Sequence, residues 1–83
     1  MKISIFGLGY VGSVSIGCLT RAGHNVVGVD IDTNKINMFN EGLVPIVEKD
    51  LDVLVKEGFD NGLIKATSSY DVAVEKSDIS FIC

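Results

Sequence analysis

Residues 3–12 read ISIFGLGYVG, an apolar run that passes directly into an uncharged, glycine-rich turn. The run Ile3–Phe6 is long enough for a short buried strand. Gly7, Gly9 and Gly12 follow it with GxGxxG spacing, which is a weak signal by itself. A turn of this kind between a strand and a helix can deliver a phosphate group to the helix N-terminus. The surrounding sequence must therefore supply both the strand and the helix.

Helical spacing follows the turn, and a second strand follows the helix. Gly23 stands where helices commonly end, so we expect a helix from about Tyr10 to Ala22. The next apolar run, NVVGVD at residues 25–30, has the continuous apolar character of a central parallel strand and ends in an acid. The residues that recur at helical spacing are Val11, Val14, Ser15, Cys18 and Ala22.

The rest of the chain continues to alternate between helical and strand-like patterns. This alternation is typical of βα units around a parallel sheet. We predict an α/β fold: the first half of a Rossmann-like, doubly wound parallel sheet, with strand order 3-2-1-4. The later elements expected are a helix from Asp32 or Thr33 to about Gly42, a helix from about residues 48–50 to Gly58, an edge strand at 63–67, a brief helix after Ser68 or Ser69, and a strand at 78–83.

Composition and charge exclude several functions. The chain has 83 residues and a net charge of -4, with seven Lys and Arg residues spread singly. It therefore has no basic stripe for a phosphodiester backbone, and we do not expect nucleic acid as a partner. Two cysteines make neither a disulfide framework nor a metal pair. We expect Cys18 and Cys83 to be reduced and buried, in a cytoplasmic protein without a metal site.

The N-terminal segment raises one alternative, because Lys2 followed by uncharged residues up to Thr20 resembles a secretion signal. Its glycines disfavour an isolated spanning helix, and its serines and threonine dilute the apolar character. No other segment is long and apolar enough to span a bilayer. We therefore expect no membrane anchor.

Asp30 lies eighteen residues after Gly12, at the end of the second expected strand, and this spacing decides how the glycine-rich turn is interpreted. An acid about twenty residues after the glycines completes the βαβ dinucleotide-binding fingerprint. Gly7 permits the tight turn, and Gly9 lets the backbone approach a pyrophosphate. Gly12 allows the helix to pack closely on the strand. The alternative is a purely structural turn with a capping acid.

The remaining candidates surround this turn. The N–H groups near Tyr10 and Val11 would face the phosphates. Asp30 would accept hydrogen bonds from the ribose hydroxyls and repel a 2′-phosphate, which favours NAD over NADP. The spacing of Lys35 allows either a ribose or phosphate contact or a merely solvated lysine. Asp32 is expected to cap a helix rather than bind a ligand.

The sequence resembles the UDP-glucose/GDP-mannose dehydrogenases over essentially its whole length. ISIFGLGYVG, VVGVD followed by Lys35 and Ile36, PIVE at 45–48 and SDISFIC at 77–83 resemble blocks of that family in order and spacing. PIVE and SFIC lean toward the GDP-mannose branch. One departure follows Glu48, where the family usually continues with Pro-Gly-Leu and this chain has KDL.

The resemblance implies an NAD-dependent oxidation of a sugar nucleotide to its uronic acid. It implies NAD contacts at Tyr10, Val11, Asp30 and Lys35. The family's catalytic cysteine and sugar-nucleotide domain have no counterpart in residues 1–83, so no catalytic residue is assigned here. We expect these residues to form an incomplete N-terminal NAD-binding domain of a protein that is a homo-oligomer when full length.

A second function has a similar beginning. NAD-sensing regulatory modules of potassium-transport systems also start with an apolar strand, GxGxxG and a terminal Asp, and fold analogy cannot separate the two. The discriminating feature is the stretch from Asn40 to Gly62, which predicts an extra helix. A sensor module would pass from its second strand to its third through one helix.

Overall fold

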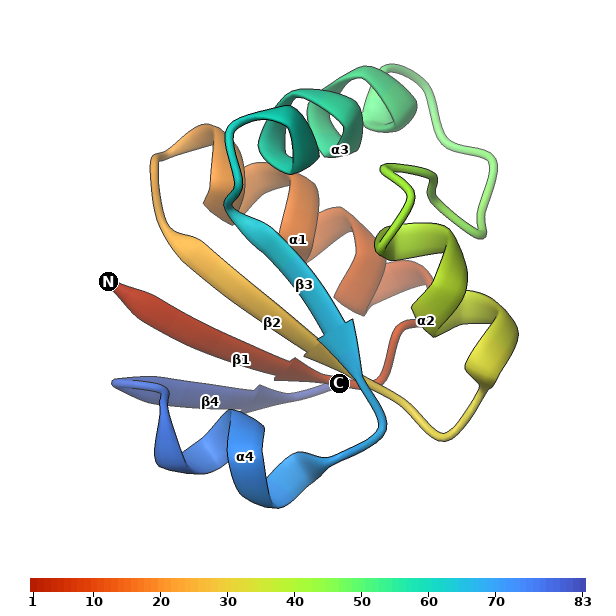
Figure 1. Cartoon of the computed structure of the whole chain (residues 1–83). Coiled ribbons are helices and arrows are strands. Elements are labelled where there is room, and N and C mark those ends of the chain that lie inside the picture. Colours follow the sequence, from red (N-terminus) through yellow and green to blue (C-terminus); the bar gives the residue numbers. More distant parts are fainter.

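Four parallel strands form one sheet, in the order β3-β2-β1-β4 (Figure 1). The computed structural model describes all 83 residues. The register places Ile5 of β1 opposite both Gly28 of β2 and Phe81 of β4. The predicted α/β class, strand order and edge position of the third strand are confirmed. The strands are β1 (Lys2–Phe6), β2 (Asn25–Val29), β3 (Ile64–Thr67) and β4 (Ile79–Ile82).

Helices cover both faces of the sheet (Figure 1). On one face α1 packs on β1 and β2, and α3 packs on α1 and β3. α2 lies on this same face and contacts β3, while α4 lies on the other face and contacts β1 and β2. No helix is long and apolar enough to cross a membrane. The helices are α1 (Tyr10–Arg21), α2 (Thr33–Phe39), α3 (Leu51–Asp60) and α4 (Tyr70–Glu75).

The main apolar core joins the sheet to α1, α2 and α3. Complete burial of an aliphatic side chain contributes about 1.5–3 kcal/mol, so this layer holds the strands and helices in their order. The predicted apolar faces of α2 and α3 are confirmed by their buried members. The core residues are Ile3, Ile5, Leu8, Ile16, Val26, Phe39, Leu51, Val55 and Ile64.

Small residues form most of the buried face of α1. Val11, one of the residues at the predicted helical spacing, is instead 62% exposed. Cys18 is also exposed, as is Cys83, so the prediction that both cysteines are buried is wrong. α1 packs against the sheet and α3 at once, which requires small residues on its inner side and leaves Cys18 outside, whereas Cys83 follows β4, a strand whose residues are all exposed. The buried residues of α1 are Gly12, Ser13, Ile16, Gly17 and Thr20.

The prediction that the third helix ends at Gly58 is wrong, because α3 continues to Asp60. Gly58 lies at the contact between α3 and α1, where a Cβ atom would stand 2.7 Å from Thr20 Oγ1. Gly17 serves the same purpose from the other helix, since its Cβ would stand 2.6 Å from Leu51 Cδ1. Both glycines let the two helices approach closely.

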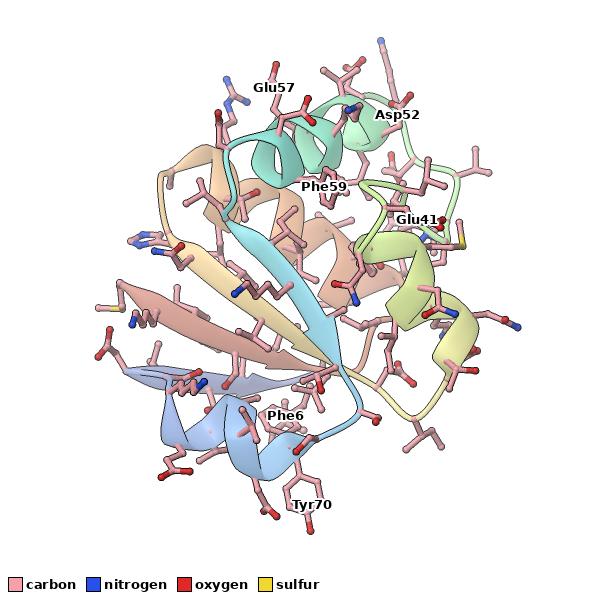
Figure 2. All side chains as sticks on the ribbon, viewed as in Figure 1. Phe6, Glu41, Asp52, Glu57, Phe59 and Tyr70 are labelled. Atoms are coloured by element: carbon pink, nitrogen blue, oxygen red, sulfur yellow. The ribbon has the colours of Figure 1, made fainter.

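The connection between α2 and α3 is a folded turn. The predicted end of α2 near Gly42 is three residues late, because the helix ends at Phe39 with Asn40 as its C-cap. Gly42 has a φ of 77° and packs against the ring of Phe59. Figure 2 shows Phe59 pointing inward from α3. This contact fixes the start of the segment that leads to Glu48.

Candidate dinucleotide-binding site

The glycine turn joins β1 to α1 in three residues, Gly7 to Gly9. Gly7 has a φ of 98°, a conformation that favours glycine, and its N–H donates to Val29 O at 2.8 Å. The first turn of α1 then lies against the loop so closely that a Cβ on Gly12 would stand 1.8 Å from Gly7 O. The turn therefore holds the N-terminus of α1 beside the carboxyl ends of β1 and β2.

The N-terminus of α1 is left without an internal cap. Gly9 is the N-cap residue, no side chain caps the helix, and its first turn contains no acid. The N–H groups of Tyr10 and Val11 make no hydrogen bond within the chain. A Cβ on Gly9 would meet nothing within 4 Å, so the space beside the backbone is open. These groups and the positive end of the helix dipole suit a bound anion.

Asp30 lies directly after β2 and faces the glycine turn. One carboxylate oxygen accepts the N–H of Leu8 at 2.8 Å, and the other accepts the N–H of Asp32 at 2.9 Å. The hydrogen bonds from Asp32 and Leu8, with a smaller contribution from the charge of Lys35, lower the pKa of Asp30 from its ordinary value of 3.8, against the opposing effect of burial. Asp30 is therefore ionised at neutral pH and retains lone pairs for a ligand hydroxyl.

The hydrogen bond between Asp30 and Leu8 is a feature that sequence reasoning missed. The available signal is topological: β1 and β2 are parallel neighbours, so an acid after β2 lies beside the turn after β1. The Leu8 side chain is fully buried while its N–H meets the carboxylate. Asp30 thus ties the two strand ends together in addition to presenting a carboxylate.

Asp32 and Lys35 lie at the start of α2. Asp32 caps the helix by accepting N–H groups of Asn34 at 2.9 Å and Lys35 at 3.4 Å, which confirms its predicted role. Lys35 is half-buried and its charge acts on Asp30. It makes no ion pair, because the one ion pair of the structure joins Lys56 to Asp60. The Lys35 ammonium is therefore free to meet a ligand.

The side chain of Tyr10 turns toward a distant segment. Its hydroxyl donates a hydrogen bond to the carboxylate of Glu48, in the connection between α2 and α3. This hydrogen bond and the negative charge of Glu48 raise the pKa of Tyr10 above 10.0. The tyrosine side chain is 57% exposed. No local pattern predicts the contact, because 38 residues separate the two partners.

The structure brings the predicted site residues to one edge of the sheet, at the carboxyl ends of β1 and β2. The same edge is where ligands bind in open α/β sheets. His24 precedes β2 and lies at the opposite end of that strand. No three His, Cys, Asp or Glu residues are grouped so that they could hold a metal ion. The residues at the edge are Gly7, Gly9, Tyr10, Val11, Gly12, Asp30 and Lys35.

The glycine turn does not line either of two clefts that lie elsewhere on the molecule. A cleft of about 590 Å³ lies along the connection from α2 to α3 and shares Glu48 with the contact to Tyr10. A second cleft of about 430 Å³ lies between α4 and the sheet. The chemistry of the turn, rather than an enclosed volume, therefore identifies this candidate site.

Comparisons with known proteins agree with this arrangement. The family model described as "UDP-glucose/GDP-mannose dehydrogenase family, NAD binding domain" matches residues 1–83. GDP-mannose 6-dehydrogenase of Pseudomonas putida is 51% identical over 83 residues, which is 100% of this chain and 19% of that protein. UDP-glucose 6-dehydrogenase of Rhizobium meliloti is 44% identical over 82 residues, 99% of this chain and 19% of that protein.

Solved structures show the same likeness. A ternary complex of GDP-mannose dehydrogenase from Pseudomonas aeruginosa matches with a TM-score of 0.97 and 51% identity, covering 100% of this chain and 19% of that one. A UDP-glucose dehydrogenase from Pyrobaculum islandicum matches with a TM-score of 0.92 and 30% identity, covering 99% and 19%. The chain thus spans about a fifth of the length of these relatives. It belongs to the UDP-glucose/GDP-mannose dehydrogenase family and corresponds to the family's NAD binding domain.

Proposed function

We propose that this chain binds the adenosine and pyrophosphate parts of NAD in a dehydrogenase that oxidises a sugar nucleotide to its uronic acid. One observation carries the proposal: the Asp30 carboxylate accepts a hydrogen bond from Leu8, in the same turn that leads into the uncapped N-terminus of α1. A group for ribose hydroxyls and a group for phosphates therefore lie side by side. When bound, NAD accepts the hydride from the substrate.

In this proposal the phosphate oxygens of NAD accept hydrogen bonds from the N–H groups of Tyr10 and Val11. Both groups lack partners within the chain, and the open space beside Gly9 allows close approach. Gly7 and Gly12 act by shaping the turn. No cationic side chain is required, because the helix N-terminus supplies the positive potential.

The hydroxyls of the adenosine ribose donate hydrogen bonds to Asp30 in this proposal, and Lys35 lies beside this carboxylate. The ionised carboxylate accepts ribose hydroxyls and repels a 2′-phosphate, so NAD is the cofactor rather than NADP. Lys35 lies close enough for its charge to act on Asp30, and its lack of an ion pair leaves it free for a ribose or phosphate oxygen.

The substrate is GDP-mannose or UDP-glucose, with GDP-mannose preferred. This preference is supported by 51% identity to the GDP-mannose 6-dehydrogenase of Pseudomonas putida, against 44% for the UDP-glucose enzyme of Rhizobium meliloti. Residues 1–83 are in this proposal an incomplete NAD-binding domain, and other domains bind the sugar nucleotide. The regulatory-sensor alternative is not favoured, because the second helix expected of a dehydrogenase between β2 and β3 is present as α3.

We also propose a cytoplasmic homo-oligomer. Two free, exposed cysteines suit a reducing compartment. The oligomer is an implication of the family resemblance. Light scattering on the full-length protein measures its mass in solution, and a monomer would contradict this part of the proposal.

Calorimetry on the full-length protein tests the cofactor. NAD is expected to bind clearly more tightly than NADP, and Asp30→Ala narrows the gap by removing both the repulsion and the ribose hydrogen bonds. Hydrogen bonds to a charged group contribute on the order of 1.5–3 kcal/mol. Glu57→Ala is the control, since this acid points outward from α3 (Figure 2). Equal affinity of the parent protein for both cofactors contradicts the assignment.

A further inference from the structure

We propose that Glu48 is a positioning residue of the NAD site, which holds Tyr10 and fixes residues 43–50 beside the N-terminus of α1. The inference rests on the NAD binding proposed above and adds a residue that lies in neither the glycine turn nor β2. Glu48 touches no NAD atom in this proposal. It acts through Tyr10, whose N–H is one of the proposed phosphate contacts.

The hydrogen bond between Tyr10 and Glu48 joins the start of α1 to residues 43–50. Tyr10 is the first residue of α1, and its hydroxyl donates to the carboxylate of Glu48. No other side-chain hydrogen bond links the segment 43–50 to α1 or to the glycine turn. Val44 and Ile46 of this segment pack against the main core, and the Tyr10–Glu48 pair is its side-chain hydrogen bond to α1.

Burial does not explain the contact. Tyr10 is 57% exposed and Glu48 is only half-buried, so neither side chain is part of the main core. An exposed hydrogen bond between flexible partners contributes little to global stability. Its effect is local, since it restrains the residue whose backbone begins α1.

The backbone beside Glu48 is also unusual. Asp50 has a φ of 65° and is the one non-glycine residue with positive φ in the chain. This left-handed residue turns the chain from the segment into α3, immediately after Glu48 and Lys49. Sparsely populated backbone conformations persist where surrounding contacts hold them, and they cluster near ligand sites. The conformation and the Tyr10 contact together indicate a segment held in a defined place.

The Tyr10 hydroxyl is a neutral donor at physiological pH even at the ordinary tyrosine pKa of 10.0, and the hydrogen bond and charge of Glu48 raise that pKa further. The negative charge of Glu48 near a pyrophosphate would by itself weaken NAD binding. The proposal therefore predicts that loss of positioning outweighs relief of this repulsion, and the sign of the effect in a charge-removing variant separates the two.

The test measures NAD affinity of the full-length protein in four variants. Tyr10→Phe removes the hydroxyl and keeps the ring and the N–H, while Glu48→Ala removes the acceptor. Each is expected to weaken NAD binding about three- to tenfold, the usual range for one hydrogen bond. The double variant should bind NAD no more weakly than whichever single variant binds it less tightly. Glu48→Gln keeps a hydrogen-bond acceptor and should bind NAD nearly as tightly as the parent protein does.

Steady-state kinetics supply the second readout. KM for NAD should rise by a larger factor than kcat falls in Tyr10→Phe and Glu48→Ala, and Glu57→Ala should match the parent. Unchanged or tighter NAD binding by Glu48→Ala overturns the inference, as do fully additive losses in the double variant. A parent protein that fails to bind NAD overturns the proposed function as well, whereas a binding parent with an unaffected Glu48→Ala overturns only the positioning role.

Discussion

At the scale of single residues, Asp30 combines a structural and a ligand-binding capacity in one carboxylate. It accepts N–H groups of Leu8 and Asp32, and because an ionised carboxylate can accept more than two hydrogen bonds, it also retains lone pairs for a ligand hydroxyl. A substitution at this position is therefore expected to affect the turn itself as well as cofactor choice. The two effects are separable, because only the structural one is present without cofactor.

The structural role of Asp30 predicts a pH dependence. Its pKa is lowered in the folded protein, so its stabilising contribution is present above the ordinary value of 3.8 and is lost as pH falls through the folded value. Asp30→Asn is expected to lower the unfolding midpoint of the cofactor-free, full-length protein at neutral pH. The difference from the parent should shrink as the pH falls below about 4. Thermal unfolding at a series of pH values measures it, and a pH-independent difference would contradict the role.

Gly9 and Gly12 should respond in opposite ways to an added side chain. A Cβ on Gly9 meets nothing within 4 Å, so Gly9→Val should remain folded and lose NAD binding. A Cβ on Gly12 would stand 1.8 Å from Gly7 O, so Gly12→Ala should destabilise the fold by at least about 1–3 kcal/mol. Circular dichroism and calorimetry on the same samples distinguish the two. Normal NAD affinity in a folded Gly9→Val protein would mean that the turn is only structural.

Local pattern predicted the residues of the turn but not their partners. Gly7, Gly12 and Asp32 occupy the predicted places in the turn and at the helix cap, because these roles depend on neighbouring backbone. The partners of Asp30 and Tyr10 come from other elements. They follow from the packing of strands and loops, which sequence spacing does not encode.

At the scale of elements, the boundary errors have a common cause in tertiary packing. Gly58 matches a helix-ending signal in sequence, but in the structure it lies inside α3 where that helix contacts Thr20. The exposed Cys18 likewise follows from the choice of Gly17 for the inner face of α1. Helical periodicity located both helices correctly, while the identity of their contact faces depended on the close approach between them.

The edge strand β3 is protected by a side chain that imitates a neighbouring strand. The Asn40 amide donates to Ala66 O at 3.0 Å, and its carbonyl oxygen accepts the Ala66 N–H at 2.9 Å. Exposed strand edges otherwise present unpaired backbone groups to other chains. Asn40 thus connects the end of α2 to the outer edge of the sheet.

Asn40→Ala is expected to lower the free energy of unfolding by about 1–3 kcal/mol, since it removes two hydrogen bonds that contribute roughly 0.5–1.5 kcal/mol each. Asn40→Asp keeps the acceptor and loses the donor, so its loss should be smaller. Chemical denaturation of the full-length protein measures both, with Asn34→Ala as a surface control on the same helix. Equal free energies of unfolding for Asn40→Ala and the parent would show that water replaces the two Asn40 hydrogen bonds with no loss of stability.

At the scale of the whole molecule, the parallel order β3-β2-β1-β4 places the end of β2 beside the turn after β1, where the candidate site forms. This order was predictable because alternating strand and helix patterns allow few connections. The path of residues 43–50 over α1 was not predictable, since it depends on the contacts of Glu48 and Phe59. The location of the candidate site therefore follows from the strand order, whereas the position of residues 43–50 beside it follows from tertiary contacts.

Residues 1–83 produced alone are expected not to oxidise any sugar nucleotide. Hydride transfer requires a cofactor ring held against a substrate carbon, and the proposed contacts in this chain hold only the adenosine and pyrophosphate parts. Oxidation to an acid through a covalent thiohemiacetal also needs an activated thiol. Neither Cys18 nor Cys83 has a hydrogen bond to a base, and the one histidine, His24, lies at the opposite end of β2 from Asp30.

The measurement is NADH absorbance with GDP-mannose and with UDP-glucose, run on residues 1–83 and on the full-length protein in parallel. Circular dichroism of residues 1–83 reports whether they fold alone, which matters because β4 forms one exposed edge of the sheet. Turnover by residues 1–83 would contradict the proposal that these residues bind only part of NAD and that other domains bind the sugar nucleotide. Turnover by the full-length protein with GDP-mannose alone would establish the preferred branch, and turnover with UDP-glucose alone would reverse it.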